Sequence, residues 1–153
     1  MPAFGGNFLF QPYGSPIVTA PSSNTPSIVG FGTVSSNLQY SWRCGSFLMV
    51  QGIFSTGTST ATQAQIPTMF NGSTVTVDTS RCNASGLCGA FSVGANSGNV
   101  WTIIVPSSNQ TYVNMGVGSA GTNPLAAANG SAISGSAGQT VAYFFSVPIV
   151  GWS

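Results

Sequence analysis

The side chains of this 153-residue chain that could do acid–base or nucleophilic chemistry, or bind a metal, include three charged residues and three cysteines. The charged residues are Arg43, Asp78 and Arg81, and the chain contains no Lys, Glu or His. General acid–base catalysis normally uses His or a carboxylate, and a nucleophilic Ser or Cys normally needs a neighbouring base. Because Asp78 is the only carboxylate side chain, we expect no catalytic residues and no enzyme activity.

Cys44, Cys82 and Cys88 are equally poor material for a metal site. A structural zinc site usually needs four Cys or His ligands, and a calcium or magnesium site needs several oxygen ligands, mostly carboxylates. We therefore expect no metal and no cofactor. Cys82 and Cys88 are close enough in sequence to form a local disulfide, but the odd number of cysteines favours reduced thiols.

The three charged residues are the first candidates for contacts with a partner. Asp78 and Arg81 could form an ion pair that pins a loop or could contact a partner, although a surface pair contributing well under about 1 kcal/mol is the favoured interpretation. Arg43 stands between Trp42 and Cys44. It could stack on an aromatic ring and donate hydrogen bonds at a subunit interface, or it could face solvent.

Composition excludes two further classes of partner. Charged residues make up 2% of the chain and the formal net charge is +1, so no basic patch exists for nucleic acid. No apolar run reaches the roughly 18 residues of a membrane-spanning helix, and the start lacks the features of a secretory signal. Hydrophobic residues nevertheless make up 42%, which predicts a folded domain with an adequate core.

Residues 1–26 are predicted to form an extended N-terminal arm. Four prolines, at positions 12, 16, 21 and 26, oppose helix formation, and no regular hydrophobic period runs through the segment. Its exposed aromatic residues would be costly to leave in water, so we expect them to dock on a neighbouring subunit or a larger assembly. These candidate interface residues are Phe4, Phe8, Phe10 and Tyr13.

Residues 27–153 have the pattern of a single β-domain, with short strands separated by turns. Asn71-Gly72 is the clearest turn, and a single short helical turn is expected at 123–130, capped by Asn123 and ended by Gly130. This pattern predicts an all-β antiparallel two-sheet sandwich, with a jelly roll preferred over an immunoglobulin-like topology. The expected strands cover residues 27–34, 37–43, 46–54, 60–66, 73–77, 99–105, 111–117 and 139–147.

Six large aromatic residues allow two interpretations, a platform on which sugars stack or packing in the core. Sugar sites usually add carboxylates, and only Asp78 is present, so core packing is favoured. The six residues are Tyr40, Trp42, Trp101, Tyr112, Tyr143 and Trp152.

Two stretches resemble virion proteins of tailed bacteriophages. They are LQYSWRCGSFLMVQGIFSTGTSTATQAQIPTMFNGSTV at 38–75 and VAYFFSVPIVGWS at 141–153, the second matching an FSVPIxGW ending. The resemblance implies a trimeric β-sandwich module that decorates or cements the capsid shell, or forms the tip of a fibre.

On this resemblance we expect a capsid decoration protein, a homotrimer that binds the major capsid protein on the outer surface of the virion after assembly in the host cytoplasm. The alternative is a receptor-binding or adhesin tip of a tail fibre that reads host glycans through loops at 83–99 and 118–138. A glycan depolymerase is the enzymatic alternative, and it would depend on Asp78 acting without a partner carboxylate.

Overall fold

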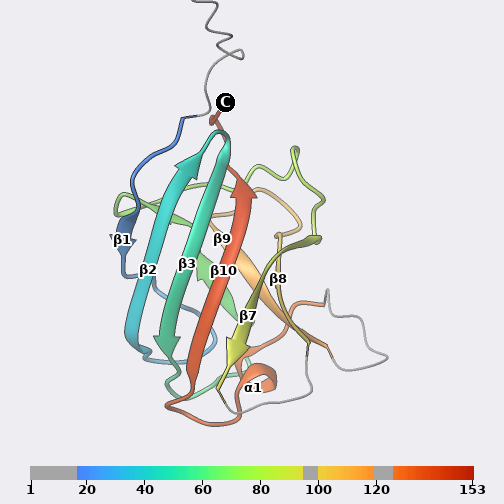
Figure 1. Cartoon of the computed structure of the whole chain (residues 1–153). Coiled ribbons are helices and arrows are strands. Elements are labelled where there is room, and N and C mark those ends of the chain that lie inside the picture. Colours follow the sequence, from blue (N-terminus) through green and yellow to red (C-terminus); the bar gives the residue numbers. More distant parts are fainter. Residues whose placement is uncertain (1–16, 95–99, 119–125) are drawn as a thin grey trace, which may run out of the picture.

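Alternating apolar and polar residues, interrupted by Gly and Asn turns, fold into an almost entirely β-stranded domain (Figure 1). The computed structural model describes residues 17–94, 100–118 and 126–153. The strands are β1 (Ser22–Asn24), β2 (Ser35–Cys44), β3 (Phe47–Ser55), β4 (Gln65–Pro67), β5 (Met69–Phe70), β6 (Ser73–Thr74), β7 (Leu87–Val93), β8 (Val100–Ile104), β9 (Tyr112–Gly118) and β10 (Thr140–Pro148), and the one helix in these ranges is α1 (Gly130–Ile133).

The described strands form one curled antiparallel sheet in the order β1-β2-β3-β10-β7-β8-β9-β4, with β5 and β6 as a separate hairpin. In Figure 1, β1, β2, β3 and β10 form the front layer, β8 and β9 lie behind it, and β7 leads from one layer to the other. The predicted all-β antiparallel sandwich is therefore confirmed, with both layers supplied by the curling of one sheet.

A hydrophobic core fills the space between the two layers. Every second residue of β3 and β10 points into it, as the two-residue period of a strand requires. Leu48, Phe54 and Phe145 are almost fully buried from the front layer, and Ile103 and Met115 from the layer behind. These residues belong to a single contiguous cluster.

Turn chemistry follows the sequence at the β5–β6 hairpin. Asn71 and Gly72 have φ values of 50° and 79°, the left-handed pair that a two-residue hairpin turn prefers. The predicted Asn71-Gly72 turn is therefore confirmed.

Several element predictions differ from the structure. The strand expected at 60–66 shortens to β4 at Gln65–Pro67. Residues 27–34 contain no strand, because Gly30 and Gly32 adopt φ values of 98° and 58° and bend the chain. Strand β7 was missed, since its Gly and Cys residues lack the composition of a typical strand. The short helix begins at Gly130 instead of ending there, with Asn129 as its N-cap, and residues 123–125 of the predicted turn lie outside the described residues.

The described part of the predicted arm, residues 17–26, lies along β2 of its own sheet. Strand β1 pairs with β2 from Ser22↔Ser41 to Asn24↔Gln39, and Val18 forms a bridge to Cys44. Phe4, Phe8, Phe10 and Tyr13 lie outside the described residues.

Candidate functional site

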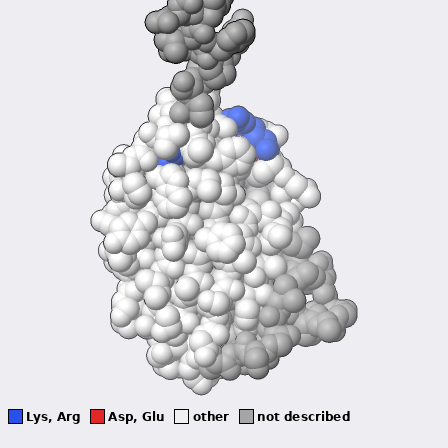
Figure 2. All heavy atoms as spheres, in the orientation of Figure 1, with Lys and Arg blue, Asp and Glu red and all other residues white. Residues whose placement is uncertain are grey.

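Both arginines hold the C-terminal residues of the chain. Arg43, at the end of β2, donates from Nε to the carbonyl oxygen of Gly45 (2.7 Å) and from Nη2 to that of Ser153 (3.0 Å). Arg81 donates from Nη1 to the carbonyl oxygen of Trp152 (2.6 Å). Figure 2 shows the two basic side chains at one end of the molecule, which we call the arginine end.

The Trp152 ring also contacts two side chains, those of Arg43 and Phe70. The guanidinium carbon of Arg43 lies 4.8 Å from the centroid of the Trp152 ring, within the range of a cation–π contact. Phe70 meets the same ring edge-on, with centroids 5.0 Å apart. The C-terminal ending therefore packs against the 38–75 stretch.

Asp78 and Arg81 do not pair with each other among the described residues. The Asp78 carboxylate instead accepts hydrogen bonds from Ser80, including one from its backbone N–H at 3.1 Å. The Asp78 side chain thus stabilises a local turn, and the Arg81 side chain stabilises the C-terminal residues. Each of the three charged side chains, including Arg43, forms hydrogen bonds within the chain itself.

The cysteines are free thiols. Cys44 is exposed, whereas burial, with a smaller contribution from nearby Cys82, raises the pKa of Cys88 to about 12. Cys88 donates weakly from Sγ to the carbonyl oxygen of Ile103. A thiol with a pKa this high remains protonated near neutral pH and is a poor nucleophile. Among the described residues, no three potential metal ligands lie together.

Strand β2 presents its apolar side chains to solvent and its polar side chains to the interior. Leu38 and Tyr40 are exposed, whereas Gln39 and Ser41 are fully buried. Several of the buried polar atoms have hydrogen-bond partners: Ser41 Oγ accepts from Asn24 Nδ2 (2.9 Å), and Gln39 Nε2 donates to Pro67 and Tyr143, whereas Gln39 Oε1 has no partner among the described residues. Burial of a polar residue costs little when its partners are present, so this reversed orientation is stable.

Gly52 makes room for the hydrogen bond that holds the buried Gln39 side chain. It lies opposite Tyr143, and the Tyr143 ring crosses over it so that the hydroxyl accepts from Gln39 Nε2 at 3.2 Å. A Cβ at position 52 would lie 2.3 Å from Cζ of that ring. The pKa of Tyr143 is raised because the phenol is buried.

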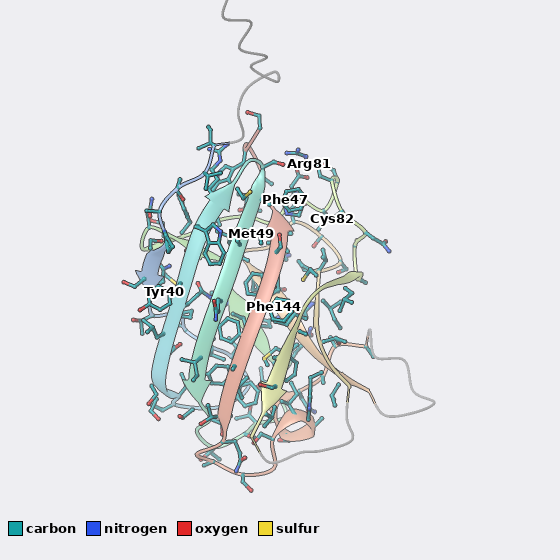
Figure 3. The ribbon with its side chains drawn as sticks, in the orientation of Figure 1. Tyr40, Phe47, Met49, Arg81, Cys82 and Phe144 are labelled. Carbon is teal, nitrogen blue, oxygen red and sulfur yellow. The ribbon has the colours of Figure 1, made fainter. Side chains whose placement is uncertain are left out.

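The outer surface of β2, β3, β10 and β7 is consequently apolar and uncharged, and we call it the outward face. Side chains directly opposite on neighbouring strands share the face, as in the row Tyr40, Gln51, Phe144, Ala90. Phe144 is 61% exposed and Tyr40 47% exposed; Figure 3 shows both over the front of the sheet. The outward face comprises Leu38, Tyr40, Trp42, Phe47, Met49, Gln51, Ile53, Ala90, Ser92, Ala142, Phe144 and Ser146.

Two open hollows lie on the outward face. One, of about 320 Å³, lies between β7 and β10 and is bordered by Ala90, Ser92 and Phe144. The other, of about 400 Å³, lies among β2, β3 and β10 and is bordered by Tyr40, Gln51 and Ile53. Neither contains a charged side chain, so apolar contacts and hydrogen bonds are the interactions available there.

The prediction that the six large aromatic residues pack in the core is correct for only some of them. Core packing is confirmed for Tyr143, which is buried, and Trp101 packs against Phe91 with ring centroids 5.2 Å apart. Tyr40 and Trp42 instead belong to the outward face, and the signal for this was the Gln and Ser residues that alternate with them. The alternation marks two faces, but only the covering residues decide which one is buried.

Comparison of the chain with protein-family models, with curated proteins and with solved structures found no significant match. Within the described ranges, no helix has the length and apolar character needed to cross a membrane.

Proposed function

We propose that this protein is a structural protein of a bacteriophage virion, a homotrimer that decorates the capsid and stabilises it through non-catalytic contacts with the major capsid protein. The observation that carries the proposal is the outward face, an uncharged surface on which the large apolar side chains of Leu38, Tyr40, Phe47, Ile53 and Phe144 are exposed. Exposed apolar surface of this extent is typical of a protein that works in an assembly. The resemblance of residues 38–75 and 141–153 to virion proteins supports the same function.

The arginine end is the part of the molecule that we assign to the shell. The described chain starts there, because the carbonyl oxygen of Ile17 accepts from the N–H of Gly45 at 2.8 Å. Ile17 and Val18 are 52% and 65% exposed. Residues 1–16, which carry Phe4, Phe8, Phe10 and Tyr13, precede Ile17 in the sequence and are proposed to contact the capsid protein.

Association of this kind is driven by burial of apolar surface, which contributes roughly 25 cal/mol per Å² before the entropy of association is subtracted. The sequence supplies no histidine and a single acidic side chain. The proposed contacts therefore use packing and neutral hydrogen bonds, with Arg43 and Arg81 occupied by the backbone of the chain itself.

The proposal is tested by counting copies of this protein in purified particles of a phage that encodes it, with the major capsid protein as internal standard in quantitative mass spectrometry. A decoration protein should be present in a fixed ratio to the shell subunits. A count of only a few copies per particle would contradict the decoration function.

The receptor-binding tip of a tail fibre is the second candidate, and the two hollows on the outward face favour it. Tyr40 and Phe144 border them, and aromatic rings can stack on sugars. Binding of the isolated protein to host cells or to a glycan array, lost in a Tyr40→Ala variant, together with a low copy number, would select this function over decoration.

A further inference from the structure

We propose that the outward face is the subunit interface of the homotrimer, with the strands of three copies running along a three-fold axis and their outward faces turned toward it. This inference rests on the proposed function, which includes a homotrimer, and it assigns the surface and the residues nearest the axis.

The chemistry of the outward face fits a further copy of the same chain. The face carries no charge and its exposed large side chains are apolar, so an uncharged and largely apolar partner fits it, and a second copy of the face is such a partner. The side chains of the face also become smaller from its β2 edge to its β7 edge. Strand β2 presents Leu38, Tyr40 and Trp42, whereas β7 presents Ala90 and Ser92.

The width of the face fits three copies. Packed sheets are separated by about 10 Å, so a sheet facing a central axis lies about 5 Å from it. An equilateral prism with an inner radius of about 5 Å has sides of about 17 Å, which is close to the roughly 19 Å spanned by four strands at about 4.8 Å each. The four strands of the outward face are adjacent in the sheet, in the order β2-β3-β10-β7.

The area of the face is also adequate. Nine residues of a strand such as β3 extend about 30 Å, so four strands cover about 570 Å² before the relief of the side chains is counted. Standard interfaces use about 800 Å² from each partner. Because each face is divided between two neighbours, one pair of copies buries less than a standard interface, but the three faces together cover about 1,700 Å², close to the roughly 1,600 Å² that a standard complex buries in total.

At each corner of the prism, β2 of one copy meets β7 of the next. The hollow of about 320 Å³ lies on that β7 edge, where Ala90, Ser92 and Ala142 are small. These small side chains leave room for the large Tyr40 ring of the neighbouring copy. Large and small side chains thus interdigitate, as in a well-packed core.

Gln51 and Phe144 lie nearest the axis. They are directly opposite each other on β3 and β10, the two central strands of the outward face. The Gln51 amide is uncharged and can both donate and accept hydrogen bonds, so three copies can satisfy one another around the axis. A charge at this position would instead be brought close to two like charges.

The decisive variant is Gln51→Glu, which keeps the shape of the side chain. Light scattering after gel filtration should give wild-type protein three times the 15.5 kDa of one chain. At about pH 8 the variant should run as a monomer, with its trimer dissociation constant raised roughly a hundredfold or more by the three carboxylates. At about pH 4, where a glutamate is largely protonated, the trimer should return.

Gln63→Glu is the matched control, since Gln63 is exposed and lies beside β4, outside the outward face. This variant should remain a trimer at both pH values. Phe144→Ser is a second test: the ring is 61% exposed in the single chain, so its loss should leave thermal unfolding of the monomer nearly unchanged while weakening the trimer.

A wild-type mass of one or two chains, or a Gln51→Glu variant that stays trimeric at about pH 8, would overturn the three-fold interface. Failure of the proposed function is separable. Capsid binding by a protein with no trimer leaves the decoration function standing, whereas a stable trimer absent from purified particles removes the decoration function and leaves the interface standing.

Discussion

At the scale of single residues, Gly52 decides how β2 can be oriented. Because position 52 has no side chain, the Tyr143 ring occupies that space and reaches the buried Gln39 on the far side. Gln39 is also tied to the carbonyl oxygen of Pro67 at 3.2 Å. Glycine at position 52 therefore allows β2 to turn its polar side chains toward the core and its apolar side chains toward solvent.

Replacing Gly52 with Ala should destabilise the fold by about 1–3 kcal/mol, the usual cost of overpacking a core. The added Cβ would lie 2.3 Å from both Cζ and the hydroxyl oxygen of Tyr143, so the ring must move and its hydrogen bond to Gln39 must break. Urea unfolding followed by circular dichroism measures the change.

Gly135→Ala is the matched control for this prediction. No atom lies within 4 Å of a Cβ placed there, so we expect a change within about 0.5 kcal/mol. Equal effects of the two substitutions would contradict the role assigned to Gly52.

At the scale of elements, the segment after β10 is fixed to the β2–β3 turn by Arg43. The guanidinium bridges the carbonyl oxygens of Gly45 and Ser153 and covers the Trp152 ring. A planar fork with several donors can make these contacts together, which an ammonium group cannot do in the same geometry. Arg43 therefore connects the β2–β3 turn to the C-terminal residues at the arginine end.

Arg43→Lys should lower the free energy of unfolding by about 1–2 kcal/mol, because one hydrogen bond and part of the ring contact are lost. The change should also increase hydrogen exchange at the Trp152 amide, which donates to the carbonyl oxygen of Ile149 at 3.1 Å. Hydrogen-exchange mass spectrometry checks this locally.

Arg81→Lys serves as the comparison. Arg81 is exposed and makes one side-chain hydrogen bond among the described residues, to Trp152. Its replacement should cost less than about 0.5 kcal/mol. A larger loss from Arg81→Lys than from Arg43→Lys would show that Arg43 is not the main contact.

At the scale of the whole molecule, the shortage of ionisable groups predicts an unusual dependence of stability on pH. With no histidine in the chain, no side chain has an ordinary pKa between about 5 and 8. The half-buried Cys88 and the buried Tyr143 instead have their pKa values raised by burial. Stability should therefore depend on pH mainly on the alkaline side.

The direction of the alkaline effect follows from proton binding. Above the ordinary Cys value of 9.0 the unfolded chain loses the Cys88 proton, whereas the folded chain keeps it up to about pH 12. The folded state then binds more protons, so stability should fall by about 1.4 kcal/mol per pH unit for each such group. Urea unfolding between about pH 6 and pH 11 measures this slope.

Cys88→Ala should reduce the part of the decline that begins near pH 9.0, to which Cys82 also contributes because burial and the charge of Asp78 raise its pKa, and Tyr143→Phe should remove the part that begins near pH 10.0. Cys44→Ala, at an exposed thiol, is the matched control and should retain the decline. An unchanged slope in both of the buried-site variants would contradict the assignment.

The all-β class, the Asn71-Gly72 turn and the scarcity of groups for catalysis could all be predicted from the amino-acid sequence. These follow from local properties: strand-forming composition, left-handed turn residues and the identity of the titratable side chains. The bend at Gly30 and the strand from Leu87 to Val93 escaped prediction because each depends on contacts with residues distant in sequence. Position 89, for example, has room only for glycine, because a Cβ there would lie 2.2 Å from the carbonyl oxygen of Phe144 in the neighbouring strand.

The side of β2 that faces the core depends on tertiary contacts and could not be predicted from the sequence. The alternation of Leu38, Gln39, Tyr40 and Ser41 is the same whichever side is buried. Hydrogen bonds from Asn24 and to Pro67 and Tyr143 make the polar side the inner one. The outward face exists for that reason: the partners that satisfy the buried polar groups come from strands and turns brought together by folding.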